Sequence, residues 1–384
     1  MNELFRKVIT QNKTLLKIAK AVNFLRHSTI VRQDGSSKKY PKVIQLPITY
    51  LCNSHCVMCN IWQMDHENEA TVDEFAQFLH DPIFKEVEFV GINGGEPSLL
   101  RNLPEYTKKI LDLPKIKGLN IISNGFNHNA LFKALEVIYH DCSSKGVTFH
   151  VSISLDGIGI IHDTVRGTPY AFEKATTTID EIIKNKSRYC DSFDIGCTIV
   201  NQNIEHIMQL DAFAQSKNYD IKYRLGVGNK RLHNEALIDT YSVIYGSQKQ
   251  SAKEFFHYKA FEAKTLQEKY KYYSIFYWLD NDNPRRLMGC MWRDDGITLD
   301  IRGELSYCAV ASKCIGSLRN RTGEAIYFDD ENIEFRKKII RECCDQCIHD
   351  YDGKPQMRDI LFFFKEMFIQ QYSMKLYRIR AWFL

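Results

Sequence analysis

Short apolar runs alternate with amphipathic segments from residue 42 to about residue 228. The apolar runs are five to eight residues long and rich in β-branched residues, as expected of buried strands. These strand candidates lie at 43–50, 87–92, 119–123, 149–155, 193–200 and 221–227. Repeated units of a strand followed by a helix predict parallel strands joined by right-handed crossovers. We therefore expect an α/β fold, a partial, open parallel β/α barrel of six βα units.

The segments between the strand candidates carry apolar residues near helical spacing. They predict helices at about 103–113, 129–141, 170–186 and 204–217. Another helix should begin at Thr71, whose hydroxyl can cap the first turn while Glu74 bonds back to the chain. Tyr223 and Arg224 on the sixth strand are candidates for the barrel interior, although strand residues equally often belong to the core.

The sequence outside the barrel divides into segments of different composition. Residues 3–26 combine apolar positions at helical spacing with many Lys and Arg, which predicts a basic amphipathic helix. Residues 288–350 contain six cysteines and predict a small cysteine-rich domain. The expected parts are an N-terminal helix with its linker, the barrel, a helical bridging segment, the cysteine-rich domain and an aromatic, basic tail, at 1–41, 42–230, 231–287, 288–350 and 351–384.

The composition narrows the class of protein. A net charge of +4 over 384 residues is too mild to indicate nucleic-acid binding. The twelve cysteines fall in clusters and no signal peptide opens the chain, so we expect a reducing cytoplasm rather than a disulfide-bonded secreted protein. No stretch is long and apolar enough to span a bilayer. The two terminal segments either pack on the protein or dock on a partner or on the inner membrane face.

Cys52, Cys56 and Cys59 lie in the run LCNSHCVMCNIW, directly after the first strand candidate. Three thiolates this close can share one metal site, but tetrahedral zinc or a four-cysteine iron–sulfur cluster would need a fourth ligand. A cluster with only three cysteine ligands leaves one iron open to a substrate or cofactor. The alternatives are a zinc knuckle and unrelated buried thiols.

Polar motifs follow the later strand candidates. The second strand ends in Gly94-Gly95-Glu96-Pro97, where the glycines allow a close backbone approach and Glu96 is an acceptor suited to an ammonium group. The third strand ends in Ser123-Asn124-Gly125. The segments VTFHVSISLDG (147–157) and HDTVRG (162–167) come next. Each could be an ordinary turn after a strand, but all fall where a barrel gathers its chemistry.

The order of these motifs resembles the radical S-adenosylmethionine (SAM) superfamily over residues 42–228. The resemblance implies that Cys52, Cys56 and Cys59 bind a [4Fe–4S] cluster whose open iron chelates SAM. It also implies that residues 94–97 bind the methionine end of SAM. The remaining implied SAM contacts are the third-strand residues Ser123 and Asn124, Ser154 at the ribose and Arg166 at the carboxylate. The family often has an aromatic residue before the third cysteine, and here it is Met58, which can fill a similar space.

The C-terminal cysteines form a second pattern, in which Cys290 and Cys308 precede the pair Cys344-x2-Cys347. Four thiolates can saturate a cluster, and structural zinc is the alternative. The layout resembles the SPASM/twitch domains of many radical SAM enzymes, and the cysteine count favours the twitch form with one auxiliary [4Fe–4S] cluster. Cys314 and Cys343 are spare ligands. The three other cysteines are expected to be core thiols, namely Cys142, Cys190 and Cys197.

The resemblance implies an enzyme that cleaves SAM to a 5′-deoxyadenosyl radical and abstracts a substrate hydrogen. A reduced flavodoxin or ferredoxin would supply the electron. The auxiliary cluster would accept one from the product radical, the role that four cysteine ligands favour, or would instead help to hold the substrate. The first forty residues are too short for the leader-binding domain of many peptide maturases, which favours a saccharide-like or other small molecule. The alternatives are a peptide-modifying maturase and a non-catalytic iron–sulfur or zinc sensor. The sequence does not single out a catalytic acid or base.

Overall fold

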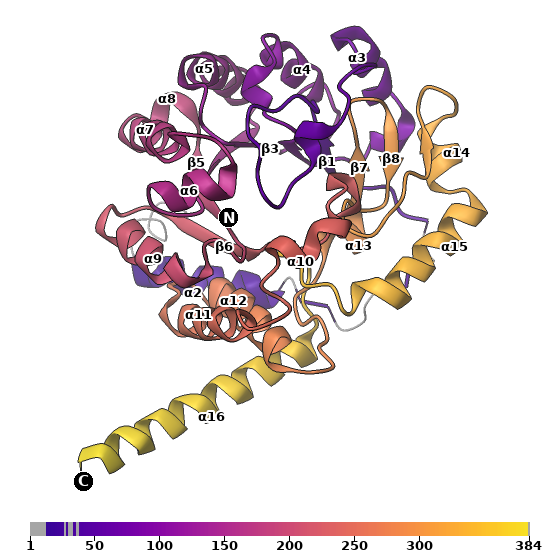
Figure 1. Ribbon diagram of the computed structural model, residues 1–384. Helices are drawn as coiled ribbons and strands as arrows, with labels where there is room; N and C mark the ends of the chain where they lie inside the picture. Colours follow the sequence, from indigo (N-terminus) through magenta and orange to yellow (C-terminus); the bar gives the residue numbers. More distant parts are fainter. Residues whose placement is uncertain (1–12, 27, 30–33, 36–37, 383–384) are drawn as a thin grey trace. The chain divides into compact units, whose positions relative to one another are not determined.

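The computed structural model describes residues 13–26, 28–29, 34–35 and 38–382 (Figure 1). The start of the predicted N-terminal helix and the last two residues of the tail lie outside this range. The chain forms two compact units. The barrel unit comprises 34–252 and 292–345, and the helical unit comprises 1–33, 253–291 and 346–384.

One sheet organises the barrel unit. Its strands are β1 (Val43–Pro47), β2 (Phe89–Asn93), β3 (Gly118–Ser123), β4 (Thr148–Ser154), β5 (Ser192–Ile199), β6 (Ile221–Leu225), β7 (Gly296–Leu299), β8 (Glu304–Ser306) and β9 (Gly316–Ser317). Their order among the described residues is β6-β5-β4-β3-β2-β1-β7-β8-β9. Strands β1 to β6 pair in parallel with their neighbours, as the alternation of strands and helices predicts. The expected α/β fold is therefore confirmed.

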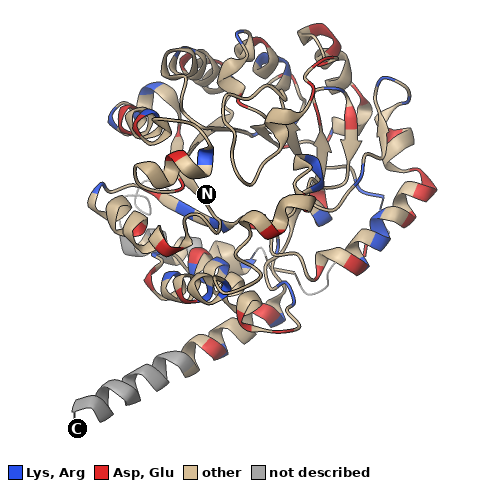
Figure 2. Cartoon of the chain, in the orientation of Figure 1, with Lys and Arg blue, Asp and Glu red and all other residues tan. Residues whose placement is uncertain are grey.

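Helices surround this sheet (Figure 1). They are α3 (Val72–Leu79), α4 (Leu103–Ile110), α5 (His128–Ser144), α6 (Ile160–Arg166), α7 (Ala171–Lys184), α8 (Lys186–Tyr189), α9 (Ile207–Ser216), α10 (Ile238–Tyr241), α14 (Gly323–Tyr327) and α15 (Asp330–Ile339). Two further helices, α11 (Lys249–Glu262) and α13 (Met291–Asp295), contain the points where the chain passes between the units. The predicted capping box is present on α3, where Thr71 accepts a bond from the Glu74 amide and Glu74 accepts one from the Thr71 amide. Figure 2 shows charges of both signs along α15.

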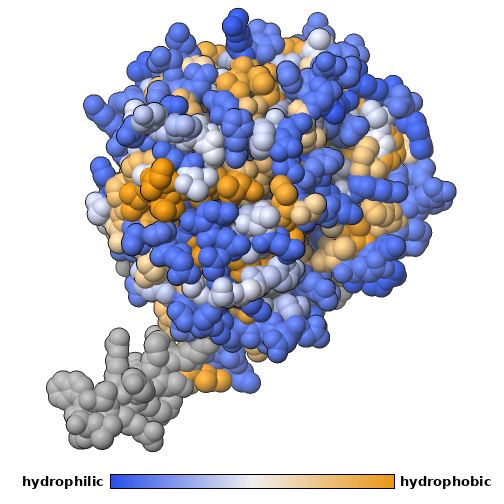
Figure 3. All heavy atoms as spheres, viewed as in Figure 1, coloured by the Kyte–Doolittle hydropathy of each residue, from blue (hydrophilic) through white to orange (hydrophobic). Residues whose placement is uncertain are grey.

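Side-chain alternation explains how the sheet is covered. Phe149, Val151 and Ile153 of β4 are fully buried, and α5 and α7 contact this strand. Because successive strand residues point to opposite faces, Ser152 and Ser154 lie on the other face, inside the barrel. Cys142, Cys190 and Cys197 are buried core thiols, as expected. On the face drawn in Figure 3, hydrophilic residues interrupt the hydrophobic areas.

Part of the cysteine-rich region belongs to the barrel sheet. Strand β7 pairs in parallel with β1, with Val43 opposite Gly296 and Gln45 opposite Thr298. Strand β8 then returns antiparallel to β7. Residues 292–345 accordingly fall in the barrel unit, and the linear domain ranges expected from the sequence stay a prediction.

The helical unit contains α2 (Lys13–Arg26), α12 (Leu266–Asp280) and α16 (Met357–Trp382). Aromatic rings join the three helices, since Tyr270 lies 5.4 Å from Phe24 and 5.4 Å from Phe363 between ring centroids. The described part of the N-terminal helix therefore packs against its own unit. Of the helices in the described part of the chain, none has the length and apolar character needed to cross a membrane.

Candidate active site

The loop of residues 51–60 follows β1 and carries the three cysteines of the first motif. Cys52, Cys56 and Cys59 are partly buried free thiols. Burial, together with the nearby charge of Cys56, raises the pKa of Cys52 to about 12 and that of Cys59 to about 11. The three thiols are thus close enough to act on one another. Such thiols need the positive charge of a metal centre to ionise near neutral pH, which suits a cluster-binding loop.

A single zinc ion and an iron–sulfur cluster make different demands on their cysteine ligands. Within the described ranges, no group of three or more His, Cys, Asp or Glu side chains is arranged to hold a metal ion. A mononuclear zinc site draws all its ligands to about 2.0–2.3 Å from one ion. A four-iron cluster is a larger centre, so its cysteine ligands stand farther apart than those of zinc. Cysteine thiolates are the ligands that such clusters use, and the assignment of the triad to a cluster stays a prediction.

The Gly94-Gly95-Glu96-Pro97 motif supports one side of the cysteine loop. The amides of Gly95 and Glu96 donate to the carbonyls of Thr49 and Leu51, at 2.6 and 2.8 Å. A Cβ atom on Gly95 would lie 2.0 Å from the Leu51 carbonyl oxygen, so only glycine fits there. The close approach in this structure is to the chain before Cys52. A contact between this motif and SAM stays a prediction.

Glu96 connects the second and third strand motifs. Its buried carboxylate accepts hydrogen bonds from the amides of Ser98 and Asn124 and from the Ser123 hydroxyl, at 2.7 to 3.0 Å. The Asn124 side chain in turn donates to Asn53 of the cysteine loop, at 2.7 Å. The structure thus brings the predicted residues together, with Pro97 at the start of the next short turn. In this structure the Glu96 oxygens accept hydrogen bonds from protein groups. A bond from the SAM ammonium group to Glu96 stays a prediction.

The HDTVRG motif supports the other side of the loop. The amides of His55 and Val57 donate to the carbonyls of Arg166 and Val165, both at 3.0 Å. The Ser54 hydroxyl also donates to the Arg166 carbonyl, at 2.9 Å. The loop is therefore held from two sides by motifs that follow β2 and β4 along the chain.

Replacing Gly167 by alanine should displace the cysteine loop. Gly167 has a φ of +58°, and a Cβ atom there would lie 2.3 Å from the His55 carbonyl oxygen. Gly146 is a matched control, because its φ is +67° but an added Cβ meets nothing within 4 Å. Left-handed backbone alone costs about 1–2 kcal/mol for a residue other than glycine, so both variants should lose that much stability. We expect Gly167→Ala also to lose most of the loop cluster, a fall of up to about four irons per chain measured after anaerobic cluster assembly.

The control sets the outcome that would contradict this account. Gly146→Ala should retain the iron content of the wild type. Equal iron content in the two variants would mean that the approach of Gly167 to His55 does not shape the cluster site.

Arg166 is a cation at the centre of the site. Its Nε lies 2.6 Å from the Asp156 carboxylate in a buried ion pair, and its Nη1 donates to the Cys56 sulfur at 3.7 Å. Asp156 also accepts from the Thr198 amide at 2.7 Å. Burial lowers the pKa of His162 well below its usual value, so its neutral ring can accept from the Asp156 amide. Arg166 therefore neutralises charge beside Cys56, while its predicted contact with the SAM carboxylate stays a prediction.

A third support comes from the loop after β6, which sequence motifs did not indicate. The Asn234 side chain donates to the Met58 carbonyl at 2.6 Å and accepts from the Asn229 amide at 2.8 Å. The Asn60 amide donates to the Leu232 carbonyl at 3.3 Å. The Met58 side chain is buried in an apolar cluster with Val165, Val200 and Tyr241. The only signal in the sequence is the polar run GNKRLHN, which has no specific meaning by itself.

The inside of the barrel is polar near the ends of β4 and β5. The Asp194 carboxylate is largely buried, yet hydrogen bonds from His150 and Ser152 and the charge of Arg224 keep its pKa low. Ser154 lies opposite Gly196 at the end of β4, and its predicted ribose contact is untested. Tyr223 points away from this interior, because its buried hydroxyl donates to Asp211 on α9.

Two of the C-terminal cysteines lie in the helical unit, where Arg286 joins their segments. Its buried guanidinium donates to the carbonyls of Met288 and Gly289, just before Cys290. It also donates to the carbonyl of Cys347 at 3.0 Å and to two later carbonyls, those of His349 and Tyr351. A Cβ atom on Gly353 would lie 2.4 Å from the Cys290 amide nitrogen, which shows how closely the segments approach.

The other two predicted ligands lie in the barrel unit. Cys308 follows β8, and its sulfur accepts from the Ala311 amide at 3.3 Å. Cys344 ends a π-helical turn, Ile340–Cys344, a feature frequent at functional sites. The spare thiols Cys314 and Cys343 are exposed. Ligation by these cysteines stays a prediction.

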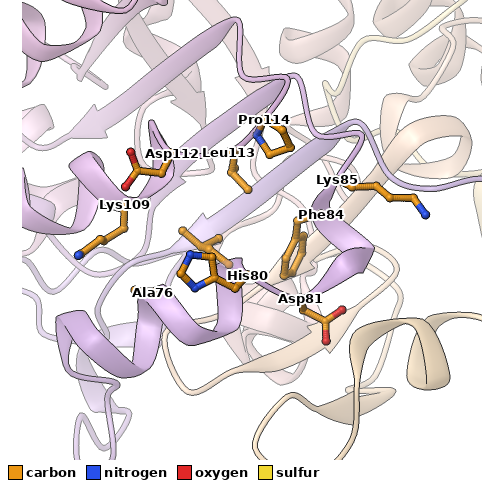
Figure 4. Close-up of a pocket in the computed structure, with 10 residues that line it drawn as sticks. Ala76, His80, Asp81, Phe84, Lys85, Lys109, Asp112, Leu113 and Pro114 are labelled. Carbon is orange, nitrogen blue, oxygen red and sulfur yellow. The ribbon is translucent and has the colours of Figure 1, made fainter.

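A separate hollow lies outside the barrel, between α3 and α4 (Figure 4). It is lined by Ala76, Leu79, His80, Asp81, Phe84, Lys85, Lys109, Asp112, Leu113 and Pro114. None of the motif residues described above lines it. This hollow is therefore distinct from the candidate active site.

Residues 46–214 match the family model of the Radical SAM superfamily. The match covers the cysteine loop, the motifs after β2 and β3, and the HDTVRG segment. This part of the chain is thus similar to a family whose members use a [4Fe–4S] cluster and SAM.

Comparison with individual proteins agrees with this assignment. The chain is 26% identical over 179 residues to a "Probable GTP 3′,8-cyclase" of Sulfolobus acidocaldarius, which is 46% of this chain and 53% of that protein. It is 24% identical over 185 residues to the GTP 3′,8-cyclase of Helicobacter pylori, covering 47% of this chain and 54% of the relative. The chain thus spans about half the length of these curated relatives.

Solved structures show the same fold. A structure of anSMEcpe with bound AdoMet has a TM-score of 0.55 at 16% identity, covering 87% of this chain and 98% of that one. Streptococcus suis SuiB bound to its precursor peptide SuiA has a TM-score of 0.54 at 14% identity, covering 84% and 71%.

Proposed function

We propose that this protein is an enzyme that cleaves SAM reductively at a cluster held by Cys52, Cys56 and Cys59, and then removes a hydrogen atom from its substrate. The observation that carries the proposal is the convergence of three segments on the cysteine loop. The glycine motif, the HDTVRG motif and the loop after β6 all bond to its backbone. A loop fixed in this way holds its thiols in one arrangement, as a cluster with an open iron requires.

The bound cluster and SAM would supply the radical chemistry itself, a one-electron cleavage that yields methionine and the 5′-deoxyadenosyl radical. The protein's residues position and insulate these groups. Arg166 places a positive charge next to Cys56, and Asp156 fixes its guanidinium. Met58, Val165 and Tyr241 place an apolar wall beside the loop, which limits the access of water.

We further propose an auxiliary [4Fe–4S] cluster on Cys290, Cys308, Cys344 and Cys347. The bonds from Arg286 to the segments of Cys290 and Cys347 support this ligand set. With four cysteine ligands, the cluster would have no open iron, which suits an electron acceptor better than a substrate-binding centre. A reduced flavodoxin or ferredoxin would supply the electron for SAM cleavage. Iron and sulfide analysis should give about eight irons per chain, whereas about four irons with one zinc would favour the zinc alternative.

For the substrate, we propose a saccharide-like or other small molecule whose carbon is oxidised or rearranged. A peptide is the second candidate, favoured by the structural similarity to proteins solved with peptides, SuiB with SuiA and anSMEcpe with the Cp18Cys peptide. The test is an anaerobic reaction with SAM and dithionite in the presence of sugars, aminocyclitols or cysteine-containing peptides. The true class should stimulate 5′-deoxyadenosine formation and yield a product of altered mass. Stimulation by peptides alone would reject the small-molecule proposal.

A further inference from the structure

Arg231 lies in the loop after β6, and its backbone position is fixed. The amides of Lys230 and Arg231 donate to the carbonyls of Val310 and Ala309, both at 3.1 Å. The segment from β6 to α10 thus crosses to the chain that follows β8 (Figure 1). It joins β6, at one edge of the open sheet, to the chain between β8 and β9, at the other edge, and we call this junction the seam of the barrel.

Two nitrogens of the partly buried Arg231 side chain have no protein partner. Its Nε and Nη1 atoms are inaccessible to solvent and make no hydrogen bond to any described residue. Burying the N–H groups of a cation without an acceptor is costly, so an arginine kept in this state is suited to bind an anion.

The Arg231 segment meets the end of the cysteine loop. The Asn60 amide, next to Cys59, donates to the carbonyl of Leu232, next to Arg231, at 3.3 Å. The Glu96 and Asn124 side chains, which belong to the predicted SAM site, meet the start of the loop instead, where Asn124 donates to Asn53. The position of Arg231 therefore suits a ligand other than the methionine end of SAM.

We propose that Arg231 binds an anionic group of the substrate, a carboxylate or a phosphate, at the seam of the barrel. This inference rests on the proposed function and adds the chemical class of the substrate. The planar fork of arginine matches two oxygens of a carboxylate or phosphate. A substrate held there by its anionic end would lie beside Cys59, and so beside the cluster.

The test uses full-length protein with its clusters assembled without oxygen. Inorganic phosphate, pyrophosphate and succinate are titrated in the presence of SAM, by calorimetry and by ³¹P line broadening for the phosphates. We expect at least one of them to bind the wild type, and Arg231→Gln to weaken that binding about tenfold or more. Arg231→Lys should lose less, because it keeps the charge. Arg188→Gln is the matched control, since Arg188 is exposed and pairs with Glu136 on the outside of the barrel unit.

The outcomes separate the possible ligands. The affinity for SAM should stay within about twofold in Arg231→Gln if the arginine serves the substrate, because no bond to SAM is lost. Loss of SAM affinity would assign Arg231 to the SAM carboxylate and overturn the proposal, as would an equal loss of anion binding in the control or no anion binding by the wild type. Failure of SAM cleavage would count against the proposed function alone, because anion binding is measured without turnover.

Discussion

The Cys52→Ala variant should form no 5′-deoxyadenosine above background when supplied with SAM and dithionite. Cys52 is one of only three thiols in the loop, so its loss leaves two ligands for the cluster that binds SAM. Loss of a residue that merely orients a metal ligand costs about 10–100-fold in affinity or activity, and loss of a ligand should cost more. We expect cleavage to fall by over a hundredfold and the iron content to fall by about four per chain.

Cys190→Ala is the control for this variant. Cys190 is a buried thiol of the barrel unit between α8 and β5, away from the cysteine loop. It should cost about 1–2 kcal/mol of stability through lost packing and leave the iron content unchanged. If Cys52→Ala cleaved SAM at the rate of the control, the assignment of the first cluster to this loop would be wrong.

The Arg286→Met variant should lose the auxiliary cluster and much of the stability of the helical unit. Methionine fills a similar volume but leaves five carbonyls of the Cys290 and Cys347 segments without their donor. Each buried acceptor left unpaired costs about 1–3 kcal/mol, so we expect the free energy of unfolding to fall by at least about 3 kcal/mol. Chemical denaturation and iron analysis measure the two effects.

Two comparisons distinguish this role from general damage. Arg286→Lys keeps a cation that can reach some of the carbonyls, so it should recover part of the iron. Arg188→Met removes an exposed arginine of the barrel unit that pairs with Glu136, away from the C-terminal cysteines, and should leave both readouts unchanged. Full iron content in Arg286→Met would show that this arginine does not position the auxiliary ligands.

The barrel could be predicted because its signals are local. Each strand is marked by a short apolar run, and the helix at α3 by the capping pattern of Thr71 and Glu74. The cysteine triad is likewise visible because its spacing is short. The convergence of the later motifs on that loop follows from parallel strands, whose carboxyl ends meet at one edge.

The parts that escaped prediction depend on contacts between residues far apart in sequence. Asn234 supports Met58 from 176 positions away, and Arg286 reaches carbonyls more than 60 positions later. No local pattern marks such residues. The pairing of β7 with β1 also escaped prediction. Strand β7 has only four residues and lies in a cysteine-rich segment, so its sequence does not mark it as a strand or indicate its neighbour. Glu96 shows a further limit of prediction from sequence. The motif indicates a carboxylate at the site, but it does not show that this carboxylate accepts hydrogen bonds from Ser98, Ser123 and Asn124.

The central claim is that this chain cleaves SAM at the cysteine loop. The most direct measurement is made on protein reconstituted without oxygen, with SAM and dithionite added and both 5′-deoxyadenosine and methionine quantified. We predict that the two products appear in equal amounts and that neither forms in Cys52→Ala. If the loop holds its cluster and binds SAM, yet neither product forms with any of the sugars, aminocyclitols or peptides, the account of this protein as a radical SAM enzyme is contradicted.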